Sequence, residues 1–289
     1  MPTSDRRTPE ARPSRTAALA ARLSAAQKRA ETLPGAPIVR EAFEQERELG
    51  GGLIAGGVAF RIFLWLVPFG LVVAALLSFW SEHDPEGLED VSREFGVGAA
   101  AASAAREALQ TGDRSALFVL VFGLVLLAWF TVGALRALIL AHALAWQLTP
   151  PRIRRPFTAI AVFNGLFVLI WLSSAGLAWL REQVGVTALL SILVSFVLST
   201  AIATYAMWLL PNRAEDPREL LPGAVLIAVG GQLIQVAVIF YFAPRLGRSE
   251  ETYGAFGSAA TILVWLYVLS RLVTSAAFLN ATLWWRRRD

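Results

Sequence analysis

Long apolar runs, separated by short polar segments, dominate the chain from residue 50 onward. They cover about residues 53–80, 115–141, 157–180, 187–210, 221–243 and 255–285, and the second continues as helix to Trp146. A run of 18 or more apolar residues is long enough to cross a membrane as a helix. The pattern therefore predicts an all-α membrane protein, a bundle of six transmembrane helices.

The first apolar run is longer than a membrane requires. At roughly 1.5 Å per residue, a helix from Leu53 to Trp80 would be about 42 Å long. The hydrocarbon core of a bilayer is only roughly 30 Å thick. We therefore expect this helix to tilt, to kink at Pro68, or to protrude into the cytoplasm. Pro68 is either a hinge or a static kink, and a static kink is the commoner case.

Two polar segments carry helical patterns outside the six runs. Apolar residues from Arg15 to Leu33 recur at three- and four-residue spacing among basic ones, which predicts an N-terminal cytoplasmic amphipathic helix on the inner membrane surface. A similar stripe from Leu88 to Gln110 predicts a helix in the outer loop. The expected organisation is a disordered and amphipathic N-terminal segment (1–37), a transmembrane domain (38–285) and a basic tail (286–289).

Basic residues are distributed unequally between the two sides of the predicted bundle. With the N-terminus inside, the cytoplasmic segments hold seventeen basic residues and the outer segments hold six. The positive-inside rule therefore places both termini in the cytoplasm. No apolar run precedes residue 50, so we expect the first span, rather than a cleavable signal peptide, to direct insertion. The preference for arginine over lysine and the many alanines suggest a bacterium, and the chain would lie in its cytoplasmic membrane.

Composition narrows the chemistry that the chain can perform. Hydrophobic residues make up 56% and charged residues only 17%, against about 25% charged in soluble domains. The chain has no cysteine, and its only histidines are His83 and His142, so we expect neither a metal site nor a cofactor. No P-loop, nucleotide-binding fingerprint or Ser-His-Asp arrangement is present. These features predict a protein that is not an enzyme and whose partners are membrane lipids rather than nucleic acid.

Three arginines within the predicted spans are the strongest candidates for a binding site. Arg61, Arg136 and Arg271 all fall at mid-depth or nearer the cytoplasmic side, and the spans hold no Asp or Glu to neutralise them. A charge in hydrocarbon costs roughly 2.5–3.5 kcal/mol even on the lenient insertion scale. The three could line a cavity that attracts an anion, or each could reach the headgroups separately. We favour the second interpretation for Arg136, and leave both open for Arg61 and Arg271.

Small and polar residues within the spans have a more ordinary interpretation. Glycines recur near the start of the first and last spans, where small residues let helices approach closely; they are Gly52, Gly56, Gly57, Gly254 and Gly257. Several polar residues are expected to form hydrogen bonds between helices, namely Thr131, Asn164, Thr204, Gln232, Gln235, Ser270 and Asn280. Neither set requires a ligand.

Three stretches of the chain resemble the YihY/BrkB family of bacterial inner-membrane proteins, once labelled ribonuclease BN-like. The stretches are Gly51 to Phe60 running on to Val67-Pro68; Leu221-Pro222-Gly223-Ala224; and Tyr253 to Gly257, followed by Val264 to Tyr267 and Phe278 to Ala281. The resemblance covers about residues 40–285. Where many members have two tyrosines after the small-residue run, this chain has Phe60-Arg61.

The resemblance implies six transmembrane helices with both termini inside, in agreement with the hydropathy and charge patterns. It implies no settled chemistry, although members have been linked to serum resistance and to envelope lipid export. Two functions stay open. One is a transporter or translocator of an anionic substrate or lipid, using the intramembrane arginines. The other is a non-transporting membrane factor that organises the envelope by binding lipids or protein partners.

Overall fold

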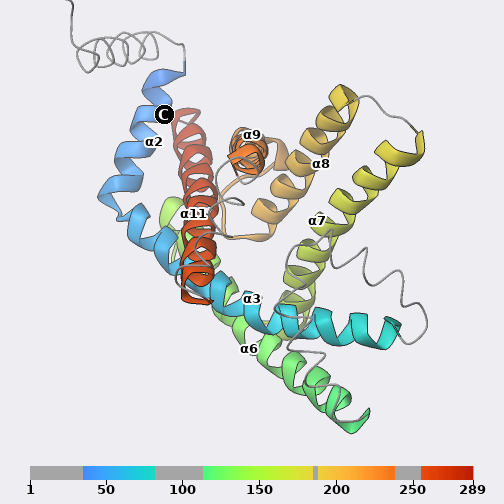
Figure 1. Ribbon diagram of the computed structural model, residues 1–289. Helices are drawn as coiled ribbons and strands as arrows, with labels where there is room; N and C mark the ends of the chain where they lie inside the picture. The colour runs from blue at the N-terminus through green and yellow to red at the C-terminus, as the bar shows by residue number, and fades with distance from the viewer. Residues whose placement is uncertain (1–34, 82–112, 185–187, 238–254, 289) are drawn as a thin grey trace, which may run out of the picture. The chain divides into compact units, whose positions relative to one another are not determined.

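A computed structural model of the chain describes residues 35–81, 113–184, 188–237 and 255–288. All regular structure in these ranges is helical (Figure 1). The long helices are α2 (Ala36–Glu48), α3 (Gly51–Ser81), α6 (Asp113–Ala145), α7 (Pro156–Val184), α8 (Ala188–Leu209), α9 (Leu221–Ala237) and α11 (Ala255–Arg286), with a short 3₁₀ helix, η1 (Pro217–Leu220). The expected helices at 15–33 and 88–110 lie outside the described residues.

Five of these helices are long and apolar enough to cross a membrane. The qualifying segments are Gly51–Val73, Leu120–Ala145, Pro156–Ser173, Leu190–Leu209 and Ala259–Arg286. α9 coincides with the start of the fifth apolar run, but its described part is 17 residues long. The structure thus confirms a multi-pass helical protein, whereas the sixth span stays a prediction, since residues 238–243 lie outside the description.

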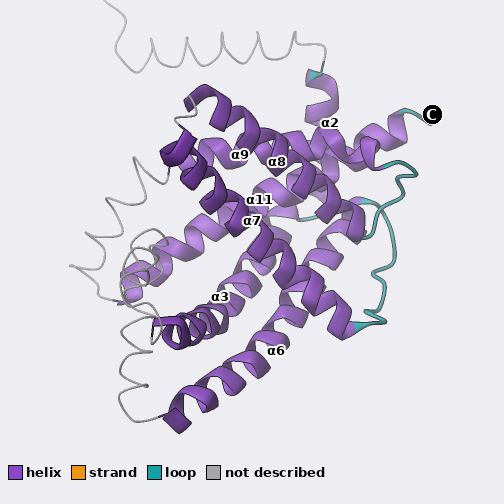
Figure 2. Cartoon of the chain, turned by 90° about the vertical axis from the view of Figure 1, so that its right-hand side faces the viewer, coloured by secondary structure: helices purple, strands orange, loops and turns teal. Residues whose placement is uncertain are grey.

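The chain divides into two compact units, residues 1–41 and 42–289. The second unit contains the membrane helices. Within it, α3 packs along α6 and α11, and α11 also packs along α9, which in turn packs on α8 (Figures 1 and 2). α7 contacts α6 and α8. α11 therefore joins the α3–α6 pair to the α8–α9 pair.

Two helix ends fix the backbone near the candidate residues. Gly50, between α2 and α3, has a φ of +70°, the left-handed conformation that glycine adopts without strain. α6 ends in a Schellman motif, in which Leu148 N–H donates to Ala143 O at 2.7 Å and Gln147 N–H donates to Leu144 O at 3.2 Å. Gln147 takes the left-handed position there, with a φ of 51°. Both turns are thus sharp and hydrogen-bonded.

Hydrogen bonds between helices confirm the expected role of several polar residues. Trp65 Nε1 and Asn164 Nδ2 both donate to Thr131 Oγ1, at 3.0 and 3.1 Å, which ties α3, α6 and α7 together. Gln232 Nε2 donates to Ser195 Oγ at 3.0 Å between α9 and α8. Each bond keeps a polar group satisfied in an environment without water.

The lateral faces of the long helices are apolar and exposed. Leu53, Trp129 and Phe157 are 86%, 76% and 85% exposed, and many other large apolar side chains are also exposed. A soluble monomer rarely exposes apolar surface on this scale. Lipid chains would cover these faces, in agreement with membrane-spanning helices.

Candidate anion-binding arginines

Arg61 lies on α3 where that helix packs against α6. A Cβ added to Gly133 of α6 would lie 3.3 Å from Nη1 of Arg61 and 3.7 Å from its Cδ. The absence of a side chain at Gly133 therefore makes room for the guanidinium group. Arg61 lies ten residues from the start of α3, roughly 15 Å along the helix, so it falls near the middle of its membrane segment.

Arg136 lies one helical turn beyond Gly133 on α6. Side chains three residues apart on a helix are neighbours, with roughly 5–6 Å between their Cβ atoms. Arg136 is therefore one turn of α6 away from the glycine against which Arg61 packs. Both arginines are exposed, and in the described part of the chain no carboxylate pairs with either.

A cavity of about 430 Å³ adjoins Arg136. Its lining residues are Arg136 and Ile139 of α6, and Pro150, Pro151, Arg152 and Ile153 of the loop that leads to α7. Among the described residues, two cations and no carboxylate line this space. The structure thus brings Arg136 together with an arginine that the hydropathy pattern does not single out.

Arg271 is not an unpaired cation, which corrects the expectation that no carboxylate neutralises the three arginines. Its Nη1 lies 2.6 Å from Oε1 of Glu46, a carboxylate of α2 that is only 2% exposed. Oε1 accepts no aligned hydrogen bond, so the contact is that of two opposite charges. Glu46 Oε2 accepts a hydrogen bond from Ser275 Oγ at 2.8 Å. Arg271 is therefore held by α2.

The hydropathy pattern did not predict this ion pair because Glu46 precedes the first apolar run. The chain turns at Gly50 between α2 and α3, and the carboxylate near the end of α2 meets α11. A Cβ on Gly51 would collide with Cγ of Glu46 and would lie 2.8 Å from its backbone oxygen. The sequence does show that Ala42 and Glu46 are four residues apart and so share one helical face. The structure shows that both residues are buried.

The three arginines do not converge on one cavity. A Cβ on Gly52 would lie 3.8 Å from Nη1 of Arg271, so this face of α3 looks toward α11. Arg61 is nine residues further on, and nine steps of about 100° turn it roughly 180° away from Gly52. Arg61 and Arg136 therefore form one group on the α6 side, and Arg271 belongs to a separate group.

The remaining candidate residues have varied surroundings. Positions 52 and 56 both face Tyr267 of α11, whose nearest side-chain atoms lie 3.7 and 4.0 Å from an added Cβ. An added Cβ at Gly57 would meet no atom within 4 Å. Pro68 is buried inside α3. Gly257 lies in the first turn of α11, and Gly254 lies outside the described residues.

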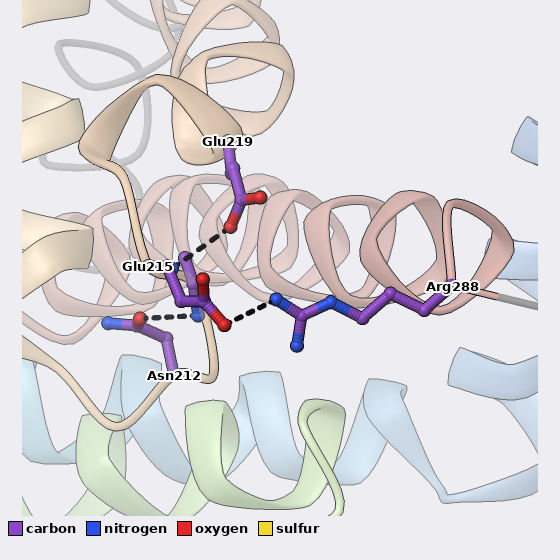
Figure 3. Close-up of polar contacts among 5 residues, drawn as sticks. Asn212, Glu215, Glu219 and Arg288 are labelled. Carbon is purple, nitrogen blue, oxygen red and sulfur yellow. Dashed lines mark hydrogen bonds and ion pairs between the residues drawn. The ribbon is translucent and has the colours of Figure 1, made fainter.

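Several basic residues gather where the loops at 146–155 and 210–220 meet the end of α11; we refer to this region as the basic end. Arg213 donates to Trp146 O and Gln147 O at 3.2 and 3.3 Å. Arg288 pairs with Glu215 at 2.6 Å, as Figure 3 shows, beside the hydrogen bond from Glu215 N to Glu219. These contacts hold the end of α6, the η1 loop and the end of α11 together.

Groups of three or more His, Cys, Asp or Glu that could hold a metal ion are absent from the described ranges. His142 is buried, and its Nδ1 lies 3.1 Å from Leu138 O. The exposed arginines of this region can hold an anion by charge.

Comparisons with known proteins agree with this architecture. The family model of virulence factor BrkB matches residues 42–289. A UPF0761 membrane protein of Nitrosospira multiformis is 26% identical over 256 residues, covering 82% of this chain and 58% of that protein. A Bacillus subtilis protein named as ribonuclease-like, YfkH, is 26% identical over 125 residues, covering 43% of this chain and 39% of that protein.

The chain thus spans roughly two fifths to three fifths of the length of these relatives. No solved structure matches the chain. Because the family match extends over most of the sequence and over α3 to α11, this chain belongs to the BrkB family of membrane proteins.

Proposed function

We propose that the protein binds an anionic lipid or a similar anionic substrate at the α3–α6 seam and moves it across the bacterial cytoplasmic membrane. Arg61 is the central binding residue, and Arg136 assists it. The observation that carries the proposal is that Arg61 lies over Gly133, near the middle of a segment long enough to span a membrane, with no carboxylate paired to it among the described residues. An exposed guanidinium at that depth is costly unless it meets an anion or water.

Arg271 has a different part in this proposal. Because Glu46 already neutralises it, Arg271 does not compete for the substrate, and it anchors α11 to the end of α2. The protein has no catalytic role here, and the ribonuclease-like name belongs to YfkH. Transport is by facilitation or by a gradient, since the sequence encodes no P-loop.

Lipid flipping in vesicles tests the proposal. Proteoliposomes would hold fluorescent phosphatidylglycerol, and an impermeant reductant would bleach the outer-leaflet label. We expect wild type to expose inner-leaflet label faster than protein-free vesicles do. Arg61→Gln should slow that rate by about tenfold, because one lost charge contact is worth roughly 1.4 kcal/mol. Arg218→Gln, which removes an exposed arginine from η1, is the matched control and should leave the rate unchanged.

One observation favours the non-transporting alternative. The structure separates Arg271 from Arg61 and Arg136, so the described residues show no single cavity lined by all three. A lipid-organising membrane factor would bind anionic lipid at such separate positions without moving it. If wild type binds phosphatidylglycerol but exposes no more inner-leaflet label than protein-free vesicles, translocation is wrong and this alternative stands.

A further inference from the structure

A cavity lies at the basic end, between the C-terminal part of α6 and the loop that leads to α7. Its volume of about 430 Å³ lies within the range of roughly 300–1,000 Å³ typical of small-molecule sites. Arg136 and Arg152 approach it from different segments, sixteen positions apart in the sequence. The other lining residues that the structure describes are two isoleucines and two prolines, so none of these offsets the positive charge.

The loop that supplies Arg152 is held in place by several contacts. The Schellman motif at Gln147 sets the direction in which the chain leaves α6. Arg213 donates to the carbonyl oxygens of Trp146 and Gln147 from a separate loop. Pro150 and Pro151 restrict the backbone further because their rings fix φ. The backbone of the loop that carries Arg152 is therefore fixed before any ligand arrives.

The surroundings of the cavity suit a lipid better than a free anion. Leu140 lies one turn beyond Arg136 on α6 and is 44% exposed, and Phe157 in the first turn of α7 is 85% exposed. These apolar side chains lie on the two helices that the cavity's loop joins, and they offer contacts for acyl chains. Basic pockets between transmembrane helices at the cytoplasmic side commonly bind phosphate headgroups.

We infer that this cavity binds the phosphate of an anionic phospholipid headgroup from the leaflet at the basic end, with Arg136 and Arg152 as its two ligands. The guanidinium forks pair with phosphate oxygens by charge-assisted hydrogen bonds. The inference rests on the proposed function only in that Arg136 is shared. Arg152 is specific to this site. Arg136 lies one turn of α6 from Gly133, the glycine against which Arg61 packs, so a lipid held at this site would load the α3–α6 seam.

Native mass spectrometry of the full chain in detergent tests the site. The probes are phosphatidylglycerol, zwitterionic phosphatidylethanolamine, and glycerol 3-phosphate as the free headgroup. We expect Arg152→Gln to reduce bound phosphatidylglycerol by about fivefold or more, with little change in phosphatidylethanolamine. Arg154→Gln, which removes an exposed arginine of the same loop that does not line the cavity, is the matched control and should bind as wild type does.

Coupling between the two arginines gives an independent readout. Arg152→Gln should weaken lipid binding less in the Arg136→Gln background than in wild type. In that background, Arg152 no longer shares the phosphate with a second guanidinium group. Equal losses for Arg152→Gln and Arg154→Gln would overturn the site, and so would full additivity of Arg136 and Arg152. Displacement of the lipid by equimolar glycerol 3-phosphate would overturn the lipid assignment and indicate a site for a free anion.

These outcomes separate the inference from the proposed function. Lipid loss in Arg152→Gln, combined with no flipping by wild type, would retain the headgroup site and reject translocation. Flipping that depends on Arg61, combined with equal lipid binding by Arg152→Gln and Arg154→Gln, would reject the headgroup site alone. Should Arg136→Gln fail to fold, the comparison of Arg152→Gln with Arg154→Gln still decides, because both residues lie in an exposed loop.

Discussion

Individual residues in this protein differ most in how their charges are satisfied. Glu46 is buried and serves two partners on α11, Arg271 and Ser275. Glu215 meets Arg288 at the same 2.6 Å separation, but 78% and 43% of those two side chains are exposed. Because solvent weakens the second pair, only the first is expected to matter for stability.

Removing one member of the buried pair should destabilise the protein strongly. We expect Glu46→Gln and Arg271→Gln each to lower the free energy of unfolding by about 3 kcal/mol, since each leaves a charge without its partner. The double variant should lose clearly less than the sum of the two. Unfolding of the purified protein in detergent, followed for the four proteins of the cycle, measures this coupling.

The exposed pair is the control for that cycle. Glu215→Gln and Arg288→Gln should each change the free energy of unfolding by about 1 kcal/mol or less, with little coupling between them. Additive losses in the Glu46–Arg271 cycle would show that the two charges do not stabilise one another.

At the scale of helices, α11 contacts the other two stretches that carry the family resemblance, in α3 and at the start of α9. Tyr267 faces the glycines of α3, and Asn280 reaches the start of α9. Asn280 Oδ1 accepts from Gly223 N–H at 2.7 Å, and its Nδ2 donates to Leu220 O at 3.1 Å. The first N–H groups of a helix have no partner within it, so Asn280 supplies one from another helix.

Close packing at this junction predicts that replacing two glycines of α9 by alanine will change the free energy of unfolding by different amounts. A Cβ on Gly223 would lie 2.6 Å from Ala276 O, a backbone atom that cannot move aside. Gly223→Ala should therefore lower the free energy of unfolding by about 2 kcal/mol. Gly231→Ala, in the same helix with no atom within 4 Å, should be neutral or stabilising, because alanine favours helix by roughly 1 kcal/mol. Thermal unfolding of both variants checks this; equal shifts would contradict the packing account.

At the scale of the whole molecule, the basic end determines the expected orientation. Arginines of the loops at 146–155 and 210–220 and of the C-terminus gather there, and the contacts of Arg213 and Arg288 join these segments. From the positive-inside rule we expect this end to lie in the cytoplasm.

Single cysteines can test this orientation directly, because the chain contains none. In intact spheroplasts, we expect a membrane-impermeant maleimide to label Asp113→Cys, at the start of α6, but not Arg154→Cys, in the loop after it. Permeabilisation should make Arg154→Cys reactive, which controls for its accessibility. Labelling of Arg154→Cys alone in intact spheroplasts would reverse the proposed topology.

Hydropathy determined much of the fold, because a membrane helix satisfies its own backbone and needs about 20 apolar residues in sequence. The helices starting at Gly51, Asp113, Pro156, Ala188, Leu221 and Ala255 begin within a few residues of the apolar runs. The three intramembrane arginines were likewise visible as charges within apolar runs. These features are local, and so a single stretch of sequence specifies them.

Tertiary structure alone decided which charges are satisfied. Glu46 reaches Arg271 across 225 positions, and the Gly50 turn and the missing side chain at Gly51 make that approach possible. Gly133 receives Arg61, and the α6–α7 loop brings Arg152 to Arg136, for reasons of packing rather than of hydropathy. Pairing depends on distances between helices, which the order of apolar residues does not encode. The sequence by itself therefore determined a multi-pass helical membrane protein, and the packing decided which of its arginines pair with a carboxylate in the described part of the chain.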